Sequence, residues 1–224
     1  MSERLYFSQL ASFSGDHTWH TVCFNSALDR ITGLRNSRSS DELETIFGAV
    51  ARGRSLMNQA LLWKTPLVGR DSSLAIIRGA QWRLVMAMAG FEIILKGLFQ
   101  NNRLTTDHFS RVQLIAHKAE IDPLKPPKIA PKQAEKWLAD ERVFEFLDVN
   151  GHDKGVLKAW MIESREMAEL ADQLHLIRAL RNCTVHAALS ATKCKQFGLK
   201  PALFHLPETL AKAWLEILMC LCSD

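Results

Sequence analysis

Apolar residues recur three or four positions apart along almost the whole chain, and no stretch shows the strict alternation of a half-buried strand between turn residues. This spacing predicts an all-α fold, a helical bundle of about seven helices. A length of 224 residues suits a single domain over 1–224, with two small domains as the alternative. The expected helices cover about 17–34, 41–62, 72–100, 106–119, 131–149, 153–186 and 207–222.

Local signals set several of these boundaries. Asp41 with Glu44 three residues on has the pattern of a capping box at the start of the second helix. Pro207 is the expected start of the last helix. The segment at about 121–131 carries four prolines, so it cannot be helical and is either a stiff connector or an ordered surface loop. The helix at 72–100 has apolar residues around much of its circumference, which predicts burial on more than one side.

Composition and chain ends indicate a cytoplasmic protein. The five cysteines are an odd number without zinc-ligand spacing, which is typical of reduced thiols in a core. The amino-terminal residues are polar, unlike a signal peptide, and the most apolar run, 84–99, contains Glu92 and Lys96 and is too short to span a bilayer. The formal charge of +4 permits a phosphate-bearing partner without requiring one.

The stretch LIRALRNCTVH places Arg181, Asn182 and His186 at the end of an apolar helix. An imidazole moves protons near neutral pH and a guanidinium binds phosphate, so the pair suits cleavage of RNA by attack of the ribose 2′-hydroxyl on its adjacent phosphate. Residues five apart on a regular helix are rotated by about 140° from each other. Arg181 and His186 therefore converge only if the chain bends between them, or each meets its counterpart across a dimer.

Spacing alone is weak evidence, because Arg103 and His108 have the same gap of four residues. The distinguishing feature is Asn182 directly after the arginine, since an RNxxxH match is expected about once in a hundred chains of this composition. The alternative interpretation of Arg181 and His186 is a plain helix end, where cations favourably meet the helix dipole.

The motif RNCTVH resembles that of the HEPN domains, an all-helical family whose hallmark is an Arg, four to six residues and then a His, often with a polar residue after the Arg. Members that keep the motif are typically metal-independent endoribonucleases of toxin–antitoxin, phage-defence and CRISPR systems, and work as dimers whose motifs face each other. The resemblance implies that Arg181 and His186 are catalytic, that Asn182 orients them, and that no cofactor is needed.

Glu92 is a carboxylate inside the apolar run AMAGFEIILKGLF, where an isolated charge would be costly. One interpretation pairs it with Lys96, four residues on along the helix surface. The other has Glu92 reach Arg181 or His186 as an orienting carboxylate, as an acidic residue of a preceding helix does in some HEPN nucleases.

Further basic residues near the motif are candidates for a strip that follows an RNA backbone, although charge runs are more often solvated faces. These are His175, Arg178, Lys193 and Lys195. Asp16, His17 and His20 with Cys23 have part of a metal-site spacing, but they lack a convincing fourth ligand, so no metal is expected.

The leading hypothesis is therefore a metal-independent endoribonuclease that acts on RNA as a homodimer, whose interface passes next to the motif. The alternative is a non-catalytic scaffold or nucleotide-binding module that acts through a protein partner, such as an antitoxin of the nucleotidyltransferase type. A helical sensor of small ligands is a third interpretation, and rests on apolar content alone.

Overall fold

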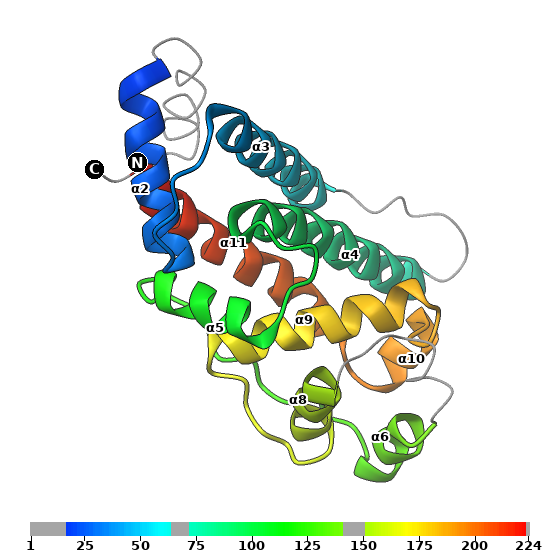
Figure 1. Ribbon diagram of the computed structural model, residues 1–224. Helices are drawn as coiled ribbons and strands as arrows, with labels where there is room; N and C mark the ends of the chain where they lie inside the picture. Colours follow the sequence, from blue (N-terminus) through cyan, green and yellow to red (C-terminus); the bar gives the residue numbers. More distant parts are fainter. Residues whose placement is uncertain (1–16, 64–71, 141–150, 223–224) are drawn as a thin grey trace.

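The computed structural model describes residues 17–63, 72–140 and 151–222. Regular structure in these ranges is helical apart from one isolated bridge between Leu124 and Met167, so the predicted all-α class is confirmed. The described part holds nine helices rather than about seven (Figure 1). Their bounds are α2 His17–Thr32, α3 Ser40–Leu62, α4 Ser72–Phe99, α5 Thr106–Ile115, α6 Pro131–Leu138, α8 Gly151–Met161, α9 Leu170–Val185, α10 Ala191–Gln196 and α11 Lys200–Cys222.

The stretch expected as one helix from 153 to the motif is two helices, α8 and α9. The residues between them leave the helical path, and Ser164 takes a positive φ of 56°. Met167 then pairs with Leu124 through both of its backbone groups, at 2.9 and 3.0 Å. Apolar spacing continues across this break because each helix buries its own side chains, which is why the periodicity did not reveal it.

Three predicted boundaries also differ. The capping box of α3 consists of Ser39 and Glu42 rather than Asp41 and Glu44, since the Ser39 hydroxyl accepts from the Glu42 amide. The last helix begins at Lys200 and contains Pro207 in its interior. α6 ends at Leu138, and the rest of the helix expected at 131–149 lies largely outside the described residues.

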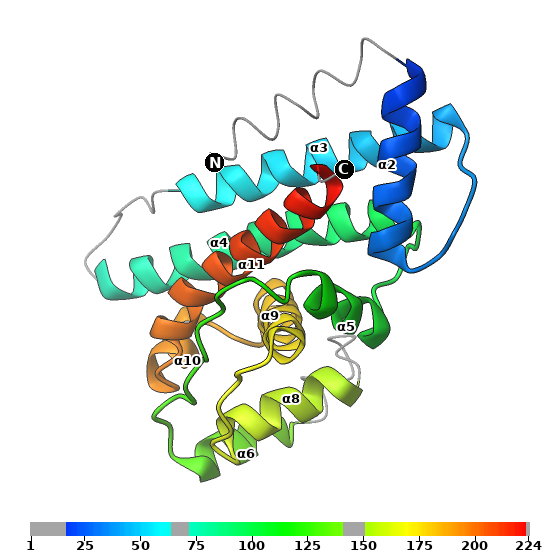
Figure 2. The ribbon, with the colours of Figure 1, turned by 90° about the vertical axis from the view of Figure 1, so that its left-hand side faces the viewer.

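The proline-rich segment at about 121–131 is an ordered surface segment packed on the helices. Besides the bridge at Leu124, the Lys125 carbonyl accepts a hydrogen bond from the Trp160 indole at 3.1 Å. The Gln173 amide of α9 donates to the Asp122 carbonyl at 2.9 Å. Figure 2 shows this segment running over the surface from α5 past α9 to α6. The segment is therefore an ordered surface loop and not a connector between two separate domains.

Helix α4 forms the centre of the fold. It packs against α3, α9, α10 and α11, and its residues Leu84, Met88, Phe91 and Leu95 are fully buried. The expectation that this helix is buried on more than one side is thereby confirmed. None of the described helices is long and apolar enough to cross a membrane.

α3 and α4 lie side by side because glycines remove side chains from their contact (Figure 1). A Cβ added to Gly53 would lie 2.4 Å from the carbonyl oxygen of Gly90, and one added to Gly90 would lie 2.5 Å from the carbonyl oxygen of Gly53. Near the end of α4, a Cβ at Gly97 would lie 2.6 Å from the Cβ of Ala49. The two backbones therefore touch, and the contact admits no larger residue.

A buried ionic cluster joins α8 to α9. Asp153 accepts from Nε of Arg178 at 2.7 Å, from Nη2 of Arg178 at 2.8 Å and from Nδ1 of His175 at 2.6 Å. Burial raises the pKa of Asp153, but the hydrogen bonds from His175 and Arg178 outweigh it and hold the pKa below its usual value. Arg178 also donates to the Leu104 carbonyl and lies 4.6 Å from the centre of the Phe109 ring.

We expect the Gly90→Ala change to destabilise the protein by about 2–4 kcal/mol, because the overlap with Gly53 exceeds the roughly 1 kcal/mol gained in helix propensity. Urea unfolding followed by circular dichroism measures the free energy of unfolding. The matched control is Gly155→Ala on α8, where an added Cβ meets nothing within 4 Å. That change should stabilise by about 0.5–1 kcal/mol. Equal effects of the two changes would contradict the close helix contact.

We expect Asp153→Asn to lower the free energy of unfolding by about 3 kcal/mol at pH 7, because it leaves the Arg178 charge buried without its partner. The folded state lowers the pKa of Asp153, so this stabilisation is present above the unfolded pKa of about 3.9 and is lost as pH falls through the folded pKa. Unfolding measured between pH 3 and 7 should therefore show the variant and wild type converging at acid pH.

The control for that measurement is Asp172→Asn. Its carboxylate pairs with Arg165 at 2.8 Å, but the Arg165 side chain is 52% exposed. An exposed pair contributes about 0–1 kcal/mol, so the control variant should stay close to wild type.

Candidate functional site

The motif lies at the carboxyl end of α9, and the helix passes through it without a break. His186 is the C-cap residue that directly follows the helix, with φ −90° and ψ 15°, and its backbone N–H donates to the Asn182 carbonyl at 3.1 Å. Ala187 follows with a positive φ of 60°, which turns the chain toward α10. A bend between Arg181 and His186, one of the two alternatives for their convergence, is therefore absent, because all of residues 181–185 keep helical hydrogen bonding.

Arg181 is held from two directions. Its Nη1 donates to Oδ1 of Asn182 at 2.8 Å, and its Nη2 lies 3.6 Å from Oε2 of Glu92 on α4. The Glu92 side chain is only 14% exposed, so this pair is screened less than a surface pair. Lys96 lies 3.9 Å from the same carboxylate oxygen. Glu92 thus lies near both of the cations that the two interpretations named, and Arg181 is the nearer one.

His186 is exposed to solvent at the end of the helix. Among the described residues its side chain makes no hydrogen bond or ion pair to Arg181 or Glu92. One chain therefore brings together Arg181, Asn182 and Glu92 but holds His186 apart. This is the geometry expected from a separation of about 140° around a regular helix.

Gln81 is a site residue that the sequence did not indicate. It is 3% exposed, and its amide donates to the Leu189 carbonyl at 2.6 Å and to the Thr184 hydroxyl at 3.3 Å. These bonds attach α4 to the turn that follows His186. An amide in the middle of an apolar helix was the available signal, since such a group needs partners when buried.

The expected basic strip is not continuous. Two of its four predicted members, His175 and Arg178, are buried and do not lie on the surface. His175 is 1% exposed and Arg178 is 7% exposed, and both face Asp153 in the interior. Neither side chain is available to follow an RNA backbone. The sequence did not indicate this burial, because the partner of both side chains, Asp153, belongs to another helix.

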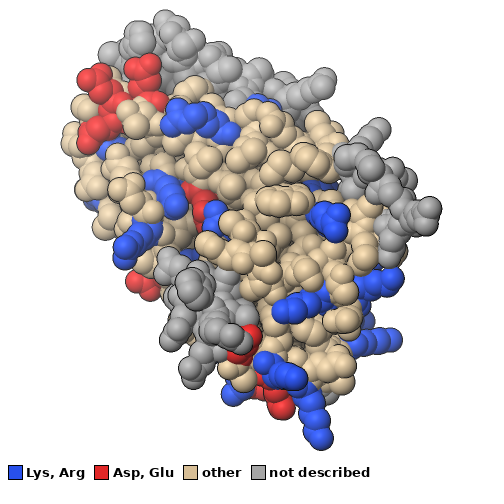
Figure 3. Space-filling model, turned by 90° about the vertical axis from the view of Figure 1, so that its right-hand side faces the viewer, with Lys and Arg blue, Asp and Glu red and all other residues tan. Residues whose placement is uncertain are grey.

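Lys193 and Lys195 lie on α10, beside the motif. Nζ of Lys193 donates to the Ala188 carbonyl at 3.4 Å, and Nζ of Lys195 to the Ser73 hydroxyl of α4 at 3.1 Å. Figure 3 shows the side of the molecule where α9 ends, with Lys and Arg side chains scattered over a largely uncharged surface. Trp82 of α4 is 47% exposed, although this helix has apolar residues around much of its circumference.

Cys183 lies inside the motif but is not suited to act as a nucleophile. Burial raises the pKa of its thiol to about 12, and burial likewise raises the pKa of Cys194 to about 12. Only the thiolate is reactive, so both thiols are inert at neutral pH.

No group of three or more His, Cys, Asp or Glu side chains in the described ranges could hold a metal ion. The Asp16, His17, His20 and Cys23 side chains lie outside the described part of the chain. The site described above thus consists of a guanidinium, an amide and a carboxylate, with an imidazole exposed nearby. Such a set can bind a phosphate and transfer protons.

Comparison with known proteins gave no match to a protein-family model, to a curated protein or to a solved structure.

Proposed function

We propose that the chain is a metal-independent endoribonuclease of the HEPN type. The observation that supports this proposal is the position of the Arg181 guanidinium, which contacts Asn182 on one side and Glu92 on the other. A guanidinium has five N–H donors, and Asn182 accepts from one of them. The donors that remain on its Nη atoms suit the oxygens of an RNA phosphate, whereas its Nε is buried. His186 is exposed five residues further on.

In the proposed reaction, the ribose 2′-oxygen attacks its adjacent phosphorus while the bond from phosphorus to the 5′-oxygen breaks. The imidazole of His186 takes the proton of the 2′-hydroxyl, and a second imidazole supplies a proton to the departing 5′-oxygen. Arg181 binds the phosphate oxygens and stabilises their developing charge. The products are a 2′,3′-cyclic phosphate and a free 5′-hydroxyl.

A second copy of the chain supplies what one copy lacks. Acid and base require two imidazoles, and Arg181 and His186 of one chain do not meet. Trp82 and Val185 are 47% and 44% exposed next to residues that hold the motif, which offers apolar area for a homodimer contact. Two Arg181 side chains in one cleft would repel each other, and the two Glu92 carboxylates would offset that repulsion.

The alternative is a non-catalytic scaffold or nucleotide-binding module with a protein partner. The same exposed Trp82 and Val185 would then contact that partner, for example an antitoxin of the nucleotidyltransferase type. In either case we place the protein in the cytoplasm, and in the catalytic case in a toxin–antitoxin or phage-defence system.

Purified protein should cleave single-stranded RNA in the presence of EDTA and leave cyclic-phosphate ends, detected by mass spectrometry. His186→Gln should lower the cleavage rate by about 10²–10⁴-fold, because it removes the proton-transfer group. The matched control is His108→Gln, at the other Arg–His pair of equal spacing. His108 accepts from the Thr105 amide at 3.0 Å, and glutamine preserves such a cap.

The control should cleave at the wild-type rate. Strict dependence on added metal, or equal loss in the two variants, would contradict the proposed mechanism. If the wild-type protein does not cleave RNA and the His186→Gln variant still binds the protein partner, the scaffold alternative is favoured.

We also expect a dimer at micromolar concentration, measured by analytical ultracentrifugation. Trp82→Glu should shift the protein to monomer and lower cleavage, since it places a charge in the proposed apolar contact. Leu34→Glu is the control, because Leu34 is 62% exposed in the loop that follows α2. A wild-type monomer with full activity would show that the shared site is wrong.

A further inference from the structure

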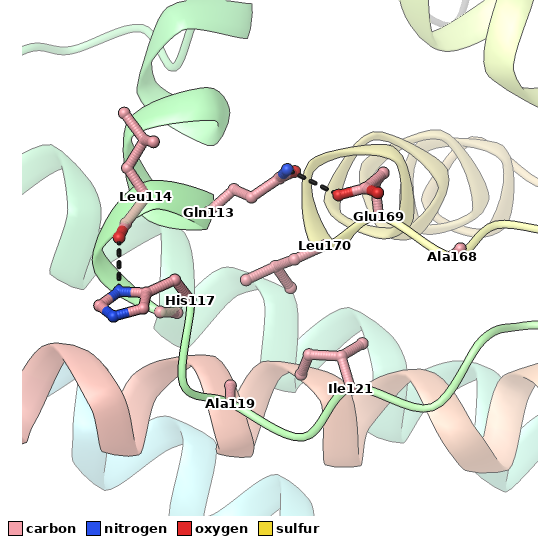
Figure 4. Close-up of a pocket in the computed structure, with 9 residues that line it drawn as sticks. Gln113, Leu114, His117, Ala119, Ile121, Ala168, Glu169 and Leu170 are labelled. Atoms are coloured by element: carbon pink, nitrogen blue, oxygen red, sulfur yellow. Dashed lines mark hydrogen bonds between the residues drawn. The ribbon is translucent and has the colours of Figure 1, made fainter.

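A pocket of about 310 Å³ lies at the other end of α9 from the motif. It is bounded by the end of α5, the turn after α5 and the first residues of α9 (Figure 4). Leu170 and Ile121 extend into the space between these segments, and Leu114 stands at its rim with 64% of its surface exposed. Leu170 is only 5% exposed, whereas Ile121 is half-buried and Leu114 is exposed, so these two leave apolar surface accessible in the pocket, as is typical of ligand sites.

The polar side chains of the pocket are those of Gln113, His117 and Glu169, and the last two offer hydrogen-bond acceptors to a ligand. Gln113 donates to Oε2 of Glu169 at 2.7 Å and accepts from the Ala171 amide at 2.9 Å, so it fixes the carboxylate and caps the start of α9. His117 lies 3.0 Å from the Leu114 carbonyl through Nδ1. A carbonyl only accepts, so Nδ1 carries the proton and Nε2 of the neutral ring is an acceptor.

The nine lining residues exclude several ligand classes. They include no Lys or Arg, so a phosphate or carboxylate ligand would find no cationic side chain. They include no Phe, Trp or Tyr, so the small imidazole ring of His117 is the one aromatic group among them on which a nucleobase could stack. The partial positive charge at the start of α9 is about half a unit, which is smaller than the full charge of Glu169.

We propose that this pocket binds the ammonium group of an aliphatic amine. The ammonium donates to Glu169 and to Nε2 of His117, and the alkyl chain covers Leu114, Ile121 and Leu170. This ligand matches an acceptor-lined rim with an aliphatic floor, and the inference does not depend on the proposed nuclease activity. The same chemistry is present in a free alkylamine and in a lysine side chain of another protein.

The test is an NMR titration of the ¹⁵N-labelled full chain with n-pentylamine hydrochloride at pH 7. A ligand of this size should bind with a Kd on the order of 1–10 mM, and shift signals at 113–121 and 168–170. Glu169→Gln should weaken binding about three- to fivefold, as expected for a partly exposed ion pair. Glu166→Gln, an exposed glutamate outside the pocket, should bind as wild type.

Sodium pentanoate and n-pentanol are the ligand controls, and both should bind more weakly than the amine. Titration with Nα-acetyl-lysine methylamide distinguishes the sources. Tighter binding than n-pentylamine identifies a protein lysine, and weaker binding identifies a free amine. The proposal is overturned if n-pentylamine causes no shifts at these residues, if pentanoate or pentanol binds equally well, or if Glu169→Gln leaves the Kd unchanged.

Discussion

The contact between Gly53 and Gly90 fixes the position of α4, and the rest of the structure depends on that helix. Because neither residue has a side chain, the backbones of α3 and α4 touch, and α4 has fully buried residues, among them Leu84, Phe91 and Leu98, along most of its length. Its opposite face carries Gln81 and Glu92, which contact the turn after α9 and Arg181. A helix that carries the supporting groups of a site must itself be rigid, and close packing provides that rigidity.

Helix α9 is the second half of this arrangement. Asp153 holds its middle through hydrogen bonds from Nδ1 of His175 and from the Arg178 guanidinium, while Nε2 of His175 is buried without a hydrogen-bond partner among the described residues. A buried cluster of this kind contributes register more reliably than net stability. The helix then presents one end to the pocket at Glu169 and the other to solvent at His186.

The fold was predictable from sequence where local signals were sufficient. Helical spacing gave the all-α class and the extent of α4, and prolines identified the extended segment before α6. The division between α8 and α9 was not predictable, because it depends on pairing of Met167 with Leu124, which is distant in sequence. Burial of Arg178 was missed for the same reason. The contact between Arg181 and Asn182 is local, and the sequence indicated it, whereas the support by Gln81 requires two segments to meet.

The proposed cleavage requires that Glu92 orient Arg181 for phosphate binding. A double-mutant cycle of RNA cleavage rates tests it most directly, with Arg181→Lys, Glu92→Gln and the double variant. If the carboxylate acts through the guanidinium, Glu92→Gln will slow wild-type cleavage but leave the rate of Arg181→Lys almost unchanged. Losses that multiply in the double variant would show that the two side chains act independently, and would contradict the account.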